Sequence, residues 1–494
     1  MRFARSFGVL LHPTSLPGPF GIGDLGPAAT QYLDWLREAG AGWWQVLPLT
    51  PVGAGGSPYS STSAFAGNPL LVSPELLVEE GLLDRREVTP LDCREVTRVD
   101  WSGAVALKEE LLEKAWRRAA GAPLPELEAF AAAEKDWLDD YAVYAALRRA
   151  HGEAPWWQWP APLAQCQREA VVAWRSQHQD EVRRIVFRQW LFHHQWQRVR
   201  QQAAARGVRV LGDAPIFVAL DSADVWANRR LFRLDPEGRP LVVAGVPPDY
   251  FSAEGQLWGN PLYDWERLAS EGYRWWIDRI AANLRLVDAL RLDHFRGFAA
   301  CWEIPAGATT AREGRWVAGP GRALFDALAA ALGPLPLVAE DLGFITDDVR
   351  ALRDELELPG MAILQFAFDP RERSAFLPYQ HRRNLVVYTG THDNNTVVGW
   401  YWREASPEVR RFFCEYAGSD GREVHWDMIR LAFASVADLA ILPQQDVAGA
   451  GEEARMNTPG VAAGNWGFRL TPGMATAAQA QRLKHLAWVY GRAQ

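Results

Sequence analysis

The sequence VDALRLDHFRGF, residues 287–298, combines a buried strand with charged residues. Its apolar residues Val287, Ala289, Leu290 and Leu292 predict a strand in the core. Arg291 and Asp293 lie two positions apart, so on a strand their side chains point to the same side. A charge in a core is costly unless it is paired or has a function. The segment therefore predicts a core strand that ends in an ion pair or a reactive group.

Comparable apolar runs that end in polar residues recur along the chain. With the run above there are eight, and they lie at 7–12, 41–49, 207–215, 284–294, 335–343, 360–368, 384–393 and 436–446. Several are rich in Val, Ile and Leu with little alternation, as in buried parallel strands. Helical patterns lie between many of them, for example at 27–40, 271–284 and 320–332. Buried strands that alternate with helices predict an α/β fold, a (β/α)8 TIM barrel.

The spacing of these runs predicts large insertions in one barrel domain that spans 1–494. Roughly 150 residues separate the second and third strands, too many for a loop without structure of its own. Residues 50–206 are therefore expected to form a mostly helical insertion subdomain over the mouth of the barrel. A smaller insertion near the rim is expected at 297–334, and a long active-site loop at 245–260.

Composition excludes several classes of function. The 494 residues are 48% hydrophobic and 23% charged with a net charge of −8, and no basic run suggests a nucleic-acid partner. No apolar segment approaches about 18 residues, so we expect no membrane span. The four cysteines lie far apart and form no metal-binding motif, which favours reduced thiols in a cytoplasmic protein.

Polar residues gather at the predicted strand ends, where barrels carry their reactive groups. The third strand ends in Asp213 and the fourth in Arg291, Asp293 and His294. The remaining candidates are Glu340 and Asp341 after the fifth strand, and His392 and Asp393 after the seventh. Four strands thus direct carboxylates to one rim.

Several carboxylates without a metal-ligand cluster suit the cleavage of glycosidic bonds. One carboxylic acid protonates the leaving oxygen while a second carboxylate attacks or stabilises the anomeric carbon. The two need different pKa values, set by different surroundings. Arg291, on the same strand face as Asp293, is placed to keep that carboxylate ionised.

Other interpretations stay open for each residue alone. Arg291 and Asp293 could form a plain buried ion pair, and Glu340 with Asp341 could cap a helix. His392, Asp393 and Asp213 could be turn residues. Clustered Asp and His could also bind magnesium or manganese.

Longer segments make the chain similar to a known family. The segments 211–227, 288–298, 337–346 and 389–396 resemble the four short regions of the α-amylase superfamily. Further segments, among them GVLLHPTSLPGPFGIGDLG (8–26), SPYSSTSAFAGNPLL (57–71) and AGVPPDYFSAEGQLWGNPLYDW (244–265), resemble the amylomaltases, the 4-α-glucanotransferases of glycoside hydrolase family 77. The resemblance covers more than nine tenths of the chain.

The resemblance implies catalytic roles for three carboxylates. Asp293 matches the nucleophile that forms a covalent glucosyl ester, Glu340 the general acid and base, and Asp393 the carboxylate that grips the hydroxyls of the cleaved ring. It implies substrate contacts for a further set of residues: Tyr59, Asp213, Gln256, Trp258, Arg291, His294, His392 and Asn465. It implies no cofactor and no metal.

The segment 245–260 is expected to favour transfer over hydrolysis. Its glycines and prolines shape a loop near the rim, and Tyr250 and Phe251 offer adjacent aromatic rings to an acceptor sugar. The alternative is that these two rings only pin the loop to the barrel. Phe366 could complete an acceptor wall or belong to the core.

The predicted function is 4-α-glucanotransfer between α-1,4-glucans by a retaining double displacement, with large cyclic glucans as possible products. The predicted partners are α-1,4-glucans, with no nucleic acid and no membrane, for a monomer or weak homodimer in the cytoplasm. The alternatives are an α-glucan hydrolase of the same superfamily, a non-catalytic glucan-binding protein and a metal-dependent barrel enzyme.

Overall fold

The computed structural model describes residues 2–91, 97–121, 123–248 and 254–493. Its centre is an eight-stranded sheet in the order β10-β11-β12-β1-β2-β3-β6-β9, in which all neighbours are parallel. These strands are β1 (Ser6–Leu10), β2 (Trp43–Gln45), β3 (Arg209–Pro215), β6 (Ala289–Asp293), β9 (Leu337–Ala339), β10 (Gly360–Ile363), β11 (Leu385–Tyr388) and β12 (Leu439–Pro443). The predicted barrel is confirmed, and each of the eight predicted runs overlaps one of these strands.

The sheet curls so that its two edge strands meet. The backbone N–H of Ala339, the last residue of β9, donates to the carbonyl of Pro359, directly before β10, at 2.9 Å. Inside the barrel, Tyr388 of β11 donates to the side chain of Gln45 of β2 at 3.0 Å. Because β11 and β2 are not neighbours in the sheet, this bond crosses the interior. The barrel is a packed core rather than a channel.

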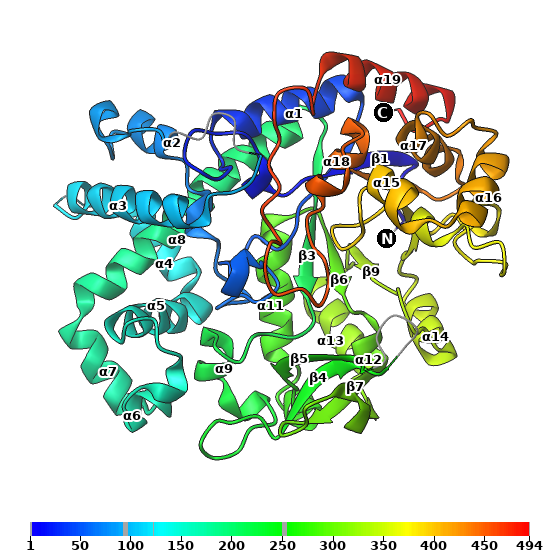
Figure 1. Ribbon diagram of the computed structural model, residues 1–494. Coiled ribbons are helices and arrows are strands. Elements are labelled where there is room, and N and C mark those ends of the chain that lie inside the picture. The colour runs from blue at the N-terminus through cyan, green and yellow to red at the C-terminus, as the bar shows by residue number, and fades with distance from the viewer. Residues whose placement is uncertain (1, 92–96, 122, 249–253, 494) are drawn as a thin grey trace.

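The helices surround the barrel and fill the long insertion. In chain order they are α1 (Pro27–Ala39), α2 (Pro74–Glu79), α3 (Trp101–Ala119), α4 (Pro125–Ala133), α5 (Lys135–Ala150), α6 (Ala161–Ala164), α7 (Arg168–Gln177), α8 (Gln179–Ala205), α9 (Ala223–Ala227), α10 (Trp265–Ser270), α11 (Arg274–Leu286), α12 (Arg296–Ala299), α13 (Arg322–Leu332), α14 (Asp347–Glu355), α15 (Val397–Gly399), α16 (Pro407–Ala417), α17 (Val424–Ala434), α18 (Gln444–Ala448) and α19 (Ala477–Val489). Helices α2 to α8 all lie between β2 and β3, and Figure 1 shows most of them projecting to one side of the barrel.

A second, antiparallel sheet lies at another side of the barrel, and sequence patterns did not predict it. Its order is β5-β4-β7-β8, with β4 (Val242–Val246), β5 (Gln256–Pro261), β7 (Ala300–Pro305) and β8 (Arg315–Ala318). The predicted loop 245–260 is therefore the end of a hairpin that begins and ends in strands. Glycine and proline interrupt the alternation in β4 and β5, and β4 also pairs with β7, which is far away in sequence.

One strand boundary also differs from the prediction. The apolar run 284–294 predicts a strand throughout, whereas α11 continues to Leu286 and β6 begins at Ala289. Leu284 and Leu286 lie on the last turn of the helix. Apolar residues continue across this junction, so periodicity alone could not locate it.

Candidate active site

A buried ion cluster lies at the ends of β3 and β6. Asp213 and Arg291 are directly paired across the two strands. Nη1 of Arg291 lies 2.8 and 2.7 Å from the two carboxylate oxygens of Asp213, and 2.9 Å from Oδ1 of Asp293. The same guanidinium nitrogen thus contacts both carboxylates. Side chains alternate between the two faces of a strand, so Arg291 and Asp293 lie on the same face of β6 and can contact each other.

The two buried members of the cluster stabilise each other. Burial opposes the charge of Arg291, but Asp213 and Asp293 outweigh it and raise the pKa of Arg291. Burial raises the pKa of Asp213, against the effect of Arg291. Asp213 also accepts a hydrogen bond from the Tyr59 hydroxyl at 2.8 Å. Asp213 thus accepts hydrogen bonds from Arg291 and Tyr59 and fixes the positions of both side chains.

Glu340 follows β9 and is bound directly to the end of β6. Its Oε2 accepts from the backbone N–H of His294, the residue after Asp293, at 2.7 Å, and its Oε1 accepts from Leu342 N–H at 2.9 Å. The backbone is bonded here as well: Glu340 N–H donates to the carbonyl of Leu292, and Phe295 N–H donates to the carbonyl of Glu340. These bonds continue the pairing of β6 with β9 beyond the end of β9. The positions of Asp293 and Glu340 are therefore fixed relative to each other by the strand ends.

The two neighbouring carboxyl groups have different surroundings. Burial, reinforced by the negative charge of Asp293, raises the pKa of Glu340 to about 8, against the opposing effect of Arg291 and two backbone donors. Asp293 instead has a side chain that is 28% exposed and is paired with Arg291. Glu340 is thus protonated at neutral pH, beside a carboxylate that contacts a cation.

His294 turns the chain away from β6 into the site. Its φ of 51° is in the left-handed region, which is unusual for a residue other than glycine. Its ring makes an edge contact with Trp258 of β5, with centroids 4.8 Å apart. Burial lowers its pKa to about 4, so the imidazole is neutral at pH 7. The side chain therefore offers a neutral hydrogen-bonding surface beside Asp293.

The loop after β11 adds a fourth carboxyl group, Asp393. His392 Nε2 lies 3.3 Å from Oδ1 of Asp393, and the Asn457 side chain donates to the same oxygen at 2.6 Å. The His392 ring stacks on Tyr59, with centroids 5.0 Å apart and planes at 16°, and Trp466 lies against both rings. An aromatic floor thus lies beside Asp393.

These residues meet around one cavity of about 580 Å³. Eight of the residues that the sequence singles out line it: Tyr59, Gln256, Trp258, Asp293, His294, His392, Asp393 and Asn465. Asp213, Arg291 and Glu340 are buried next to these lining residues. One wall is formed by Trp258 and its neighbours on β5, and another by residues 457–466.

Three named residues are not brought to this cavity by the described structure. Tyr250 and Phe251 lie outside the described residues. Phe366 follows β10, is 43% exposed and does not line the cavity; its ring contacts Phe376 at 5.9 Å. Its exposure excludes the alternative that Phe366 belongs to the core.

Several further residues line the cavity that the sequence did not single out, among them Phe217, Asn457 and Trp466. Asn457 and Trp466 fall in the segment 456–470, and Trp466 has a φ of 61°. None of the three follows a predicted barrel strand end as a charged residue, which was the signal used. Phe217 lies two residues after the end of β3, whereas Asn457 and Trp466 reach the site only because the chain returns to the barrel mouth after β12.

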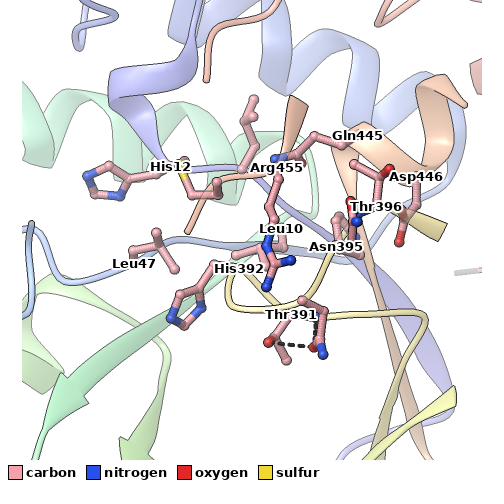
Figure 2. A pocket seen from close by; sticks show the side chains of 14 residues that line it. Leu10, His12, Leu47, Thr391, His392, Asn395, Thr396, Gln445, Asp446 and Arg455 are labelled. Carbon is pink, nitrogen blue, oxygen red and sulfur yellow. Dashed lines mark hydrogen bonds between the residues drawn. The ribbon is translucent and has the colours of Figure 1, made fainter. Parts of the chain in front are cut away.

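A much smaller cavity of about 20 Å³ lies behind His392, on the side of the barrel interior (Figure 2). It is lined by residues from β1, from the loop after β11 and from the segment after β12, among them His12, Asn395, Asp446 and Arg455. Burial lowers the pKa of His12 to about 3, so this histidine is neutral. The loop that carries His392 and Asp393 is thus backed by polar side chains.

Within the described residues, no group of three His, Cys, Asp or Glu side chains is arranged to hold a metal ion. No helix among those residues is long and apolar enough to cross a membrane. Cys166, Cys301 and Cys414 are free thiols, and Cys93 lies outside the described part of the chain.

The arrangement has the parts that cleavage of a glycosidic bond requires. A protonated carboxyl group stands beside an arginine-paired carboxylate, at the mouth of a cavity with aromatic walls. An acid and a nucleophile with separated pKa values are the two groups that glycosidic chemistry uses. The fold and site therefore define a (β/α)8-barrel enzyme equipped for chemistry on glycosides.

Comparisons with known proteins agree with this class. A family model described as 4-alpha-glucanotransferase, of glycoside hydrolase family 77, matches residues 11–476. The 4-alpha-glucanotransferase of Thermus thermophilus is 49% identical over 499 residues, 99% of each chain, and that of Synechocystis is 48% identical over 99% of this chain and 98% of its own. The amylomaltase of Streptococcus agalactiae in complex with acarbose superposes with a TM-score of 0.96 at 34% identity, covering 99% of this chain and 100% of the other.

The chain belongs to the 4-α-glucanotransferase family, glycoside hydrolase family 77. The predicted family and the predicted enzyme class are thereby confirmed.

Proposed function

We propose that the chain transfers α-1,4-glucan segments from a donor to the 4-hydroxyl of an acceptor glucan or glucose by a retaining double displacement. Asp293 attacks the anomeric carbon, and protonated Glu340 gives its proton to the leaving oxygen. The deprotonated Glu340 then accepts a proton from the acceptor hydroxyl, which displaces Asp293 and restores the original configuration. Asp393 binds the hydroxyls of the reacting ring.

The observation that carries this proposal is the contrast between the two neighbouring carboxyl groups. Asp293 contacts Arg291 at 2.9 Å, while burial raises the pKa of Glu340 to about 8. The bond from His294 N–H to Glu340 keeps the acid beside the nucleophile. This division of roles is what a double displacement requires.

The sugar-binding roles rest on the cavity lining. Tyr59 and His392 provide stacked rings beside Asp393, and Trp258, Gln256 and His294 also line the cavity. Aromatic faces pack well against the apolar faces of sugar rings. The amylomaltase of Streptococcus agalactiae, whose fold is closely similar, forms a complex with acarbose, which supports ligand binding by this fold.

Cyclic glucans are a further proposed product. When a long donor is held on Asp293, its own free end competes with other acceptors at high effective concentration. We also propose a cytoplasmic, monomeric or weakly dimeric protein that needs neither a metal nor a cofactor. Tyr250 and Phe251, which lie outside the described residues, are proposed to offer their aromatic rings to the acceptor sugar.

One incubation tests the proposed function. Pure maltotriose with EDTA should give glucose and a ladder of longer maltooligosaccharides while the number of reducing ends stays constant. Rising reducing ends without longer products would identify the alternative, an α-glucan hydrolase. No reaction with any α-1,4-glucan would favour the non-catalytic binding protein, and a loss of activity caused by EDTA would identify a metal-dependent enzyme.

A further inference from the structure

Arg455 binds two backbone carbonyls near the Asp393 carboxylate, one in the loop of Asp393 and one in the segment of Asn457. Its Nη2 donates to the carbonyl oxygen of Asp393 at 2.7 Å, and its Nε donates to the carbonyl oxygen of Asn457 at 2.8 Å. Figure 2 shows the Arg455 side chain extending toward the loop that carries Thr391 and His392. One guanidinium therefore joins two segments that are more than 60 positions apart in the chain.

Asn457 completes the connection to the carboxylate. Its side chain donates to Oδ1 of Asp393 at 2.6 Å, and its backbone N–H donates to the carbonyl of His392 at 3.0 Å. Among the hydrogen bonds of the described residues, none ends on Oδ2 of Asp393, which leaves that oxygen for a ligand. The orientation of Asp393 therefore depends on where Asn457 stands, and Arg455 holds the Asn457 backbone.

Glu404 binds the remaining nitrogen of the Arg455 guanidinium, Nη1. Its Oε1 accepts from Arg455 Nη1 at 3.2 Å and from the Asn395 side chain at 2.9 Å. Glu404 ends a π-helical turn, Trp400–Glu404, a rare type of wide turn that is frequent at functional sites. Asn395 lies two residues after Asp393, so Glu404 connects Arg455 back to the same loop.

We propose that Arg455 is a positioning residue for catalysis, which sets the orientation of Asp393 through the Asp393 and Asn457 carbonyls and is itself held by Glu404. This inference rests on the proposed role of Asp393 in binding the reacting sugar. Arg455 touches no reacting atom, and its side chain is 22% exposed at the edge of the site. It acts because a rigid planar fork directs separate N–H groups to separate acceptors.

Two substitutions of Arg455 test the proposal. Arg455→Met keeps the length of the side chain and removes every donor, whereas Arg455→Lys keeps the charge beside Glu404 but replaces the fork by a single ammonium group. Arg455→Met should lower kcat on maltotriose by about 10- to 100-fold, the size of effect that a small misplacement of a binding group produces. Arg455→Lys should recover only part of this loss, because the charge alone does not orient two carbonyls.

Arg403→Met is the matched control. Arg403 lies on the same π-helical turn, is 69% exposed and faces Glu452 at 3.4 Å rather than the Asp393 loop. This variant should keep wild-type kcat and KM. Thermal unfolding of all variants shows whether a variant loses activity because less of it is folded. For Arg455→Lys the proposal predicts a loss of activity without a loss of folded protein.

A double-mutant cycle with Asn457→Ala separates positioning from a general structural role. If both residues act by orienting Asp393, the double variant should be no more than about twofold worse than the poorer single variant. A double variant whose loss of activity equals the product of the two single losses would overturn the proposal. An Arg455→Met variant as active as the Arg403→Met control would overturn it too. Asp393→Asn is measured alongside: full activity in that variant would refute the role of Asp393 itself, whereas an inactive Asp393→Asn with an unaffected Arg455→Met would refute only the inference drawn from Arg455.

Discussion

At the scale of single residues, Glu340 carries the sharpest chemical prediction. Glu340→Gln should stop transfer from maltooligosaccharides, because an amide cannot protonate the leaving oxygen. The same variant should still react with α-glucosyl fluoride, since fluoride leaves without a proton. Release of fluoride followed over time measures this reaction. Glutamine at this position with full activity on maltotriose would contradict the assignment of the acid.

The raised pKa of Glu340 also predicts how activity and stability depend on pH. Transfer should fall as the pH rises through about 8, where the acid loses its proton. A carboxyl group whose pKa is higher in the folded than in the unfolded chain contributes stability that is fully present below its ordinary pKa and lost as the pH rises through the folded value. The melting temperature of Glu340→Gln relative to wild type should therefore increase from pH 5 to pH 9; a constant difference would contradict the shifted pKa.

Tyr59 combines two roles that two substitutions separate. Tyr59→Phe removes the hydrogen bond to Asp213 but keeps the ring against His392, and it should lower the free energy of unfolding by about 1–3 kcal/mol, the range for a bond to a charged group. Tyr59→Ala also removes the ring and should raise KM more than Tyr59→Phe does. Urea unfolding and steady-state kinetics measure the two effects, and equal KM values in both variants would argue against the ring as a sugar platform.

Sequence reasoning reached many residues of the site because charged side chains at the ends of apolar strands are conspicuous. Asp293, Glu340 and Asp393 were all recognisable as carboxylates after buried runs. The partner of Arg291 was only half predicted: the expected contact to Asp293 is present, and a second carboxylate, Asp213, shares the same nitrogen. That pairing depends on the register of β3 against β6, which no local pattern contains.

At the scale of elements, Gly8 shows how closely β1 and β2 approach. A Cβ at Gly8 would lie 2.5 Å from the Cβ of Trp43, its partner in β2. Gly8→Ala should therefore force the strands apart and cost about 1–3 kcal/mol of stability, as overpacking does. Gly307→Ala, where nothing lies within 4 Å, is the control and should change stability by less than about 0.5 kcal/mol. Urea unfolding of both variants measures the difference. Equal stability of the two variants would show that β1 and β2 can move apart at this contact without loss of stability.

The eight barrel strands were predictable because each is a short, continuous apolar run buried on both faces. The antiparallel sheet was not. Its strands β4 and β5 are broken by glycine and proline, and half of β5 is exposed, so they resemble a loop in sequence. Within the described residues, the strand β5 pairs only with β4, and β4 also pairs with β7, which follows tens of residues later and carries β8 on its other side.

At the scale of the whole molecule, Arg492 ties the C-terminus to the start of the barrel. It is fully buried and donates to the carbonyls of Ser6, Phe433, Ser435 and Ala437, at distances of 2.9 to 3.0 Å. Figure 1 shows the two chain ends on the same side of the molecule. Arg492→Met removes these bonds, although the carbonyls of Phe433, Ser435 and Ala437 still accept from Arg5. It should lower the free energy of unfolding by about 1–3 kcal/mol.

The control for Arg492 is Lys484→Met, on the exposed side of α19, which should leave stability unchanged. Thermal or urea unfolding measures both variants. A wild-type transition for Arg492→Met would mean that the C-terminal segment does not hold the barrel together.

The sequence by itself determined the α/β class, the barrel, a long helical segment between the second and third strands and a set of candidate carboxylates at the strand ends, from which the family resemblance selected Asp293, Glu340 and Asp393. These properties are local: they follow from hydrophobic runs, their spacing and the charges that end them. Only the tertiary structure decided which carboxylates share Arg291, that burial holds Glu340 protonated, and that Asn457, Trp466 and Arg455 return to the site from the far end of the chain. The physical reason is that burial, strand register and hydrogen bonds between distant segments depend on how the whole chain packs, and a linear pattern contains none of these.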